Sequence, residues 1–521
     1  MKPAEDLFEL IKSLTKSEKR YFKLFSSMQK GDKFYLKLFD AIERQTCLPP
    51  KKKSNSGQEK YDEKQVLLDL NVKGSAGWFS TAKHRLYHLL LRSMENYHSS
   101  SFSEVKSNMH RADFLYHKGL YKQSEKIIER AKQTASENEF HTSLIESSNL
   151  FEMEFAIKKA DIKKIEHILE KENTHAELLQ NTIAYRKLYF QMVMEQMKHG
   201  IVRREKQVFE IEKIIKHPLL KKKSNAKTLE AKLRFYECYA FYWETKGDYQ
   251  KALHYSEKII PLLTNNYKKT TRFVILFIRH LGNIVTLLNL LGRQEKTLRY
   301  LDEMKTQMNF LKTHAARFGP VFYQYSYSKL LYYYETGKFS ESMEEINTLE
   351  KDLNEYGVKV GDMEKTVLYS NISIMCFAAG NYKKSIVWLN KIKDEISVAV
   401  RPDIKSFVKI FYLIAHYEAG NLDLVSYLIK STHWFLEKKG RLFEFEKIML
   451  AFFRNKLQKI SSQKEISSAF IELKNNLLPL TKNDYEKNIF EYFDFISWLD
   501  SKIQNKSFSE ILRNSIGKTK T

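Results

Sequence analysis

Six segments of this chain repeat one pattern built around a glycine, and this repeat constrains the fold more than any other feature. In each segment an apolar stretch ends at the glycine, and an aromatic or apolar residue usually follows two positions later. A small or medium-sized residue stands at the fifth position, and a large aliphatic one is usual at the ninth. The six glycines are Gly119, Gly247, Gly292, Gly337, Gly380 and Gly420. A recurrence of this kind predicts an array of similar units.

Each position of the pattern has a physical cause in a helical hairpin. A glycine after a helix adopts the left-handed C-cap conformation without a Cβ clash, so it ends the first helix in a tight turn. The fifth and ninth positions then lie on one face of a second helix. Small side chains at the fifth position let the two antiparallel helices approach closely, so we expect Ala252 and Ser385 to be buried between helices. The residues at this position are Ser124, Ala252, Thr297, Ser342, Ser385 and Val425.

The unit at Gly247 resembles the tetratricopeptide repeat, in which a small residue in the first helix, a glycine at the turn, a tyrosine after it and an alanine in the second helix recur together. The matching residues are Ala240, Trp243, Gly247, Tyr249 and Ala252. The glycines from 247 to 420 are 45, 45, 43 and 40 positions apart, whereas the usual unit has about 34 residues. HEAT and armadillo repeats have about the observed length and remain the alternative, but the glycine-centred turn favours the tetratricopeptide resemblance. Between Gly119 and Gly247 the pattern blurs, and we interpret turns near Asp161 and Gly200 as parts of degenerate units.

Residues that break helices are scarce, with 17 Gly and 8 Pro among 521 residues. Long uninterrupted helices are therefore expected. We predict an all-α protein, in which residues 101–521 form a superhelix of long tetratricopeptide-like hairpins and residues 1–100 form a separate, smaller helical region. In that region Thr15 and Glu18 have the spacing of a capping box, and a polar linker covers 47–60. Residues 61–97 indicate a helix, a turn and a longer helix, as in helix-turn-helix DNA readers.

The chain is basic, with a formal net charge of +24. A basic surface attracts nucleic acid, anionic lipid or acidic proteins. The excess is spread along the chain, with one local concentration between residues 213 and 234. Its candidate anion-binding patch is Lys221, Lys222, Lys223 and Lys227. The alternative interpretation is a solvated loop between two helices.

No motif for catalysis or for cofactor binding occurs in the sequence. It lacks the glycine-rich phosphate loops, the zinc-protease motif and the strained nucleophile turn of hydrolases. His84 and His88 are four positions apart, but without an acidic or thiol ligand nearby we interpret them as surface histidines and not as a metal pair. The three cysteines lie far apart. We therefore expect no enzyme activity, no cofactor and no metal site.

One long apolar stretch begins at Phe273, but it contains Arg279, His280, Asn283 and Asn289. Such groups cost several kcal/mol each in a bilayer core, so we expect a buried helix and no membrane contact. The N-terminal residues lack the apolar run of a signal peptide. A cytoplasmic location is the expectation.

The leading hypothesis is a non-enzymatic scaffold, in which first helices of successive pairs line a concave groove that holds a protein or peptide partner. Candidate groove residues on these helices are Tyr236, Trp243, Arg279, Tyr323, Tyr327 and Asn371. The alternative is a nucleic-acid-linked regulator, in which residues 1–100 dock on DNA or RNA through the helix with Lys83, His84 and Arg85 while the repeats sense a partner. An enzyme is the third class. The sequence does not specify the partner or the oligomeric state.

Overall fold

Helices make up all the regular secondary structure in the part of the chain that the structure describes, and no strand occurs there. This computed structural model describes residues 3–27, 34–46, 61–71, 76–98, 100–266, 271–311, 315–356, 360–396, 401–456 and 463–518. The prediction of an all-α protein is confirmed for these residues. The polar linker expected at 47–60 lies outside them.

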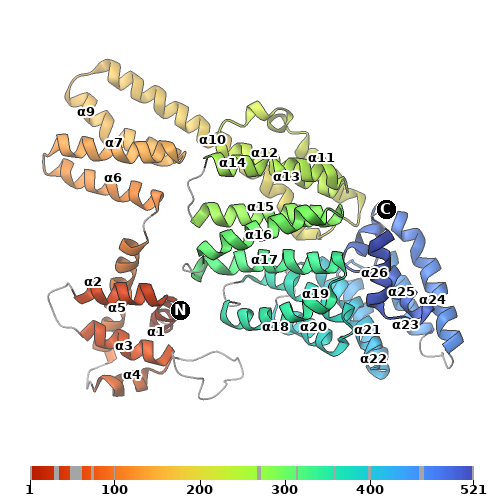
Figure 1. Cartoon of the computed structure of the whole chain (residues 1–521). Coiled ribbons are helices and arrows are strands. Elements are labelled where there is room, and N and C mark those ends of the chain that lie inside the picture. The colour runs from red at the N-terminus through yellow and green to blue at the C-terminus, as the bar shows by residue number, and fades with distance from the viewer. Residues whose placement is uncertain are drawn as a thin grey trace. The chain divides into compact units, whose positions relative to one another are not determined.

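The chain divides into two units, Met1–Ala176 with Thr313–Ala316, and Glu177–Lys312 with Arg317–Thr521. The helices of the first unit are α1 (Pro3–Ser13), α2 (Lys16–Ser27), α3 (Phe34–Thr46), α4 (Glu63–Leu70), α5 (Ala76–Tyr97), α6 (Ser101–His117), α7 (Tyr121–Glu137), α8 (His141–Ser147), the π-helical turn η1 (Ser148–Glu152), α9 (Met153–Lys158) and the first part of α10 (Ile162–His199) (Figure 1).

The first unit contains two hydrophobic clusters. One is formed by α1 to α5 and the other by α6 to α9. The last buried member of the first cluster is Leu90 and the first of the second is Val105, so the expected boundary near residue 100 falls between them. The division into domains at that residue stays a prediction. The capping box before α2 is confirmed, because the Thr15 amide donates to Glu18 Oε2 at 2.6 Å and the Glu18 amide to Thr15 Oγ1 at 3.3 Å.

The second unit begins within α10 and continues to the C-terminal helix. Its elements are α11 (Glu205–Ile215), the 3-10 turns η2 (Pro218–Lys221) and η3 (Lys223–Asn225), α12 (Leu229–Thr245), α13 (Tyr249–Glu257), α14 (Ile259–Asn266), α15 (Thr271–Leu290), α16 (Gln294–Leu311), α17 (Ala315–Thr336), α18 (Phe339–Tyr356), α19 (Asp362–Ala378), α20 (Tyr382–Glu395), α21 (Pro402–Glu418), α22 (Leu422–Lys438), α23 (Glu444–Asn455), α24 (Gln463–Leu477), η6 (Leu478–Lys482), η7 (Glu486–Glu491), α25 (Phe495–Gln504) and α26 (Phe508–Lys518).

The repeated glycines stand where one helix of a pair ends and the next begins. All six have positive φ, between 68° and 80°. At Gly247 the glycine amide donates to the Glu244 carbonyl and the Asp248 amide to the Trp243 carbonyl, each at 2.9 Å, which is the hydrogen-bond pattern of a Schellman C-cap. The predicted glycine turns are therefore confirmed. They separate α6 from α7, α12 from α13, α15 from α16, α17 from α18, α19 from α20, and α21 from α22.

Two further turns have the same hydrogen bonds without a glycine. At Ala160, with φ 52°, the next amide donates to the Ala156 carbonyl at 3.0 Å. At Glu139, also with φ 52°, the next amide donates to the Ala135 carbonyl at 2.8 Å. The expected turns near Asp161 and Gly200 are both present, the second with φ 73° at the end of α10. The turn at Glu139 has no glycine to reveal it in the sequence.

The small residues at the fifth position lie between tightly packed helices, as expected. None of the six is more than 4% exposed, and Ala252 and Ser385 are fully buried. The residues at the ninth position are buried as well. Within the second unit α12 packs against α13, α15 against α16, α19 against α20, and α21 against α22. Neighbouring pairs also touch, because α13 contacts α15 and α20 contacts α21.

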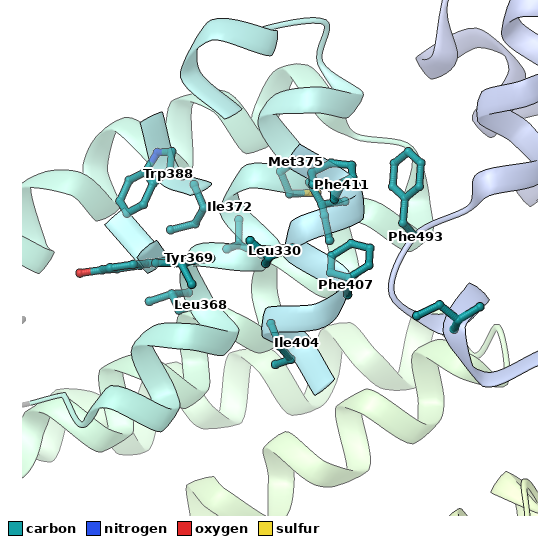
Figure 2. Close-up of a cluster of buried hydrophobic side chains, with 14 of the residues drawn as sticks. Leu330, Leu368, Tyr369, Ile372, Met375, Trp388, Ile404, Phe407, Phe411 and Phe493 are labelled. Carbon is teal, nitrogen blue, oxygen red and sulfur yellow. The ribbon is translucent and has the colours of Figure 1, made fainter. Parts of the chain in front are cut away.

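Large apolar and aromatic side chains fill the space between successive pairs. Figure 2 shows one such region of the second unit, where side chains from α17, α19, α20 and α21 and Phe493 belong to one hydrophobic cluster. Trp388, Phe407 and Phe411 are each no more than 1% exposed there. Because complete burial of a large apolar side chain contributes about 1.5–3 kcal/mol, this packing is what holds neighbouring pairs together.

The long apolar stretch forms α15. Among the described residues it alone is long and apolar enough to cross a membrane by length and composition, over Phe273–Leu290, and 67% of that window is buried inside the protein. It packs against α13, α14 and α16. A core helix of a soluble protein has the same length and composition, so this helix by itself is weak support for a membrane span.

Candidate functional site

A cavity of about 830 Å³ lies in the second unit, and the first helix of five successive pairs contributes to its wall. These helices are α12, α15, α17, α19 and α21. Their side chains at the cavity are Phe241, Glu244, Thr245, Thr286, Leu290, Tyr327, Leu331, Val367, Ser370, Asn371, Ile374 and Ile404. The corresponding second helices do not contribute, except for Tyr249 at the start of α13.

The rest of the wall comes from two segments outside the pairs. One is the connection between α10 and α11, which we call the 199–204 segment, with the beginning of α11. The other is η7 and the residues beside it, including Tyr485, Asn488, Glu491 and Tyr492. The cavity is therefore bounded by residues from both ends of the second unit.

Asp403, at the start of α21, holds the 199–204 segment on one side. Its carboxylate accepts two hydrogen bonds from Arg401, at 3.0 and 2.8 Å, one from the Tyr492 hydroxyl at 2.5 Å and one from the Ile201 amide at 3.3 Å. Burial alone would raise the pKa of Asp403, but the bonds and charge of Arg401 outweigh it and hold the pKa below its usual value. A Cβ on Gly200 would lie 1.9 Å from Asp403 Cγ, so only glycine fits at this contact.

Arg203 anchors the same segment on the other side. Its guanidinium is buried, donates two bonds to Glu446 at 3.1 Å each and one to Glu486 at 2.5 Å, and lies 4.4 Å from the ring centroid of Phe443. The Asn488 amide donates to the Val202 carbonyl at 2.7 Å. These partners lie at least 240 positions later in the chain, and no local pattern in the sequence indicates them except the basic pair after Gly200.

Among the described residues, two carboxylates at the cavity have no ion-pair partner of their own. Glu244 and Glu491 are both accessible from the cavity. Burial among protein atoms raises the pKa of Glu244 to about 7, and the charge of Glu491 adds to the effect. Burial also raises the pKa of Glu491, although a hydrogen bond from the Tyr249 hydroxyl and the charge of Lys487 oppose it. Of the other lining cations, Arg401 binds Asp403, and Lys246 is 3.1 Å from Glu212.

The structure brings two of the six predicted groove residues to this cavity. Tyr327 on α17 and Asn371 on α19 both line it. Tyr323 lies one turn before Tyr327, with ring centroids 6.1 Å apart, but it is not part of the wall.

The other three predicted groove residues lie elsewhere in the second unit. Tyr236 is buried, at 8% exposure. Trp243 is half-buried, with the Lys251 ammonium 4.1 Å from its ring centroid. Arg279 lies 3.6 Å from Glu237. None of them lines the cavity, and a role in partner binding stays a prediction for each.

The predicted anion-binding patch lies on the two 3-10 turns before α12. Lys221, Lys222, Lys223 and Lys227 are exposed. Hydrogen bonds from Asn181 and Tyr239 to carbonyls of these turns fix the loop, at 2.9 and 2.7 Å. The Lys227 ammonium lies 3.8 Å from Glu177. The loop is thus well packed at its base with exposed ammonium groups above it, and both interpretations of the patch remain open.

One of the three residues predicted to dock on nucleic acid, Lys83, is not available at the surface. Lys83 is buried at 6% exposure, donates to Glu63 Oε2 at 2.6 Å, and lies over the ring of Phe79 at 4.9 Å. It belongs to the core of the N-terminal helices, because its apolar stem packs there while Glu63 neutralises its charge. His84 and His88 lie together, with Nε2 atoms 3.1 Å apart. In the described part of the chain, no group of three or more His, Cys, Asp and Glu side chains could hold a metal ion.

Comparison with known proteins does not assign the chain to a class, since no protein-family model and no curated protein matches its sequence. Function is therefore argued from the geometry of the cavity.

Proposed function

We propose that the helix pairs of the second unit form a superhelix of long tetratricopeptide-like hairpins, and that the protein is a non-enzymatic scaffold that binds a segment of a partner protein in this cavity. The observation that carries the proposal is the shared cavity of α12, α15, α17, α19 and α21. Groove-forming repeat proteins bind peptides on the surface that their first helices share.

The hairpin geometry supports the tetratricopeptide-like part of the proposal. Each pair has a left-handed glycine at its turn and a small or medium-sized buried residue five positions later. The spacing of 40 to 45 residues is accommodated by long helices, such as α15 with 20 residues and α17 with 22. Long first helices deepen the shared surface, which suits the binding of an extended segment or a helix.

The charges at the cavity favour a segment with a basic side chain. Glu244 and Glu491 repel each other and are poorly compensated. A lysine or arginine of the partner would neutralise these carboxylates and form charge-assisted hydrogen bonds with them. The aromatic ring of Tyr327 and the amide of Asn371 would contact the same segment.

Affinity purification from the native host followed by mass spectrometry tests the proposal. The bait variants are Tyr327→Glu, which places a charge in the cavity, and Glu244→Gln, which removes one with little change of shape. The matched control is Tyr427→Glu on α22, because Tyr427 is 75% exposed and lies outside the cavity. We expect a partner that the wild type and the control retain and that both cavity variants lose, with thermal unfolding showing that all four proteins fold.

An unchanged set of associated proteins for Tyr327→Glu would overturn the proposal. The nucleic-acid-linked alternative makes a different prediction, namely retention on a polyanion column that falls steeply as salt is raised.

A further inference from the structure

A second cavity, of about 760 Å³, lies wholly in the first unit, between α7, the end of α8 with η1, and α10. Cationic side chains from two helices point to it: Lys126, Arg130 and Lys132 from α7, and Lys171 from α10. Glu129 is the one acid in its wall as described. The cavity is therefore strongly positive.

Most of this positive charge is uncompensated. Lys132 is bonded to Glu152 and lies 3.6 Å from Glu129. For Lys126, Arg130 and Lys171, by contrast, the described residues supply no carboxylate within ion-pair distance. Lys126 and Arg130 are four positions apart on one helix, where like charges repel. Three exposed cations around one recess, none within ion-pair distance of a described carboxylate, match an anion that carries more than one negative charge.

A pair of histidines, of which one is buried and one half-buried, gives a second, independent observation. His141 is 8% exposed, and neither of its ring nitrogens has a hydrogen-bond partner among the described residues. Its ring centroid is 5.5 Å from that of His175, which lines the cavity and whose Nδ1 is also without a partner there. Burial lowers the pKa of His175, and so do the charges of His141, Lys171 and Lys132. The cations around the cavity therefore act on an imidazole whose Nδ1 could still form a hydrogen bond.

We propose that this cavity binds a small phosphate-bearing ligand, whose anionic group lies between Lys126, Arg130 and Lys171. Guanidinium and ammonium groups are the side chains best suited to phosphate oxygens, and arginine binds them in a bidentate manner. The volume falls within the range of about 300–1,000 Å³ that is usual for small-molecule sites. Because the cations converge on a recess from two helices, and do not form a stripe along the surface, a small ligand fits better than a nucleic-acid strand.

Isothermal titration calorimetry of the full chain with sodium pyrophosphate tests the proposal, with sodium chloride holding the ionic strength constant. The variant is Arg130→Gln with Lys171→Gln, since both side chains are exposed and their replacement leaves the core intact. The control is Lys163→Gln, an exposed cation on α10 outside the cavity. We expect saturable binding to the wild type and the control, and at least tenfold weaker binding to the double variant.

A parallel titration with inorganic phosphate, glucose 6-phosphate and a single-stranded RNA oligonucleotide distinguishes the sources of the phosphate group. Tighter binding of the phosphate ester than of inorganic phosphate supports a site for an organic ligand. The proposal is overturned by equal pyrophosphate binding to the wild type and the double variant, including no binding to either, or by RNA binding that the double variant loses and that pyrophosphate does not displace.

Discussion

At Gly200 the backbone has φ 73°, and the side chain of Asp403 occupies the space that a Cβ would need. Two separate constraints therefore act on this residue. The left-handed backbone disfavours any L-amino acid, and the close approach of Asp403 excludes even a methyl group. Gly380 shares the first constraint, with φ 77°, but a Cβ there would meet nothing within 4 Å.

Comparing Gly200→Ala with Gly380→Ala separates these constraints. Gly380→Ala is expected to lower the free energy of unfolding by about 1–2 kcal/mol, because the alanine has to adopt the left-handed backbone conformation. Gly200→Ala adds overpacking against Asp403, which typically costs about 1–3 kcal/mol more. Urea unfolding of both variants measures the difference, and equal destabilisation would show that Asp403 moves aside freely.

Glu244 makes the stability of the second unit depend on pH. Its pKa is about 7 in the folded protein, against an ordinary value near 4.5. The folded state therefore holds its proton more tightly than the unfolded chain does, so this stabilisation is complete below about pH 4.5 and is lost as the pH rises through about 7.

For Glu244→Gln we expect the free energy of unfolding, relative to the wild type, to increase from acid to neutral pH. Glutamine does not titrate, so the variant lacks the loss of stability that ionisation of Glu244 causes in the wild type as the pH rises. Urea unfolding of both proteins at a series of pH values between about 4 and 8 measures the change. Parallel pH curves for the two proteins would contradict the prediction.

At the scale of elements, the sequence predicted what is local. A glycine turn requires only residues within one helical hairpin, and the burial of Ser385 or Ala252 follows from the period of the second helix. The part of the cavity wall formed by the 199–204 segment and η7 was not predictable from the sequence. Its contacts join residues 202 to 286 positions apart, and helical periodicity indicates only contacts between nearby residues. For the same reason only Tyr327 and Asn371 among the predicted groove residues line the cavity, since helical spacing alone did not fix which turn of each first helix faces it.

The turn at Ala160 offers a prediction at this scale. Ala160 has φ 52° and the same hydrogen bonds as the glycine turns, so its Cβ opposes the conformation that the pair of helices requires. Ala160→Gly removes this strain, and although glycine costs more backbone entropy on folding, we expect a net stabilisation of about 0.5–1 kcal/mol. Thermal unfolding measures it. The control is Ala176→Gly on α10, because Ala176 is exposed like Ala160 but has a helical backbone, where the same exchange is expected to destabilise by about 1 kcal/mol.

At the scale of the whole molecule, the second unit departs from a simple linear array. In such an array each repeat contacts only its neighbours, and unfolding can proceed unit by unit. Here Arg203, which precedes the hairpins from α12 to α22, is bonded to Glu446 and Glu486, which follow them. The bonds close a loop that contains every hairpin from α12 to α22, and so they couple its two ends.

Arg203→Met tests this coupling. Burial raises the pKa of Glu446 even with Arg203 in place, so removal of the guanidinium leaves either an unpaired buried charge or an added proton. We expect destabilisation of about 3–5 kcal/mol and a broader urea transition. The control is Arg454→Met, because Arg454 is exposed on α23, the helix that carries Glu446. A sharp single transition for Arg203→Met would show that the hairpins unfold together without this contact.

The position of Arg203 also affects how the protein can be made. After a ribosome has added Arg203 to the chain, it must add 243 more residues before Glu446 has been synthesised. At a synthesis rate of roughly 5–20 residues per second, that interval is on the order of ten to fifty seconds. During this interval the nascent hairpins emerge and pack in order, while the guanidinium of Arg203 stays hydrated without its carboxylate partners. Folding of the second unit is therefore expected to finish only after Glu446 has been synthesised, whatever the speed at which each hairpin forms.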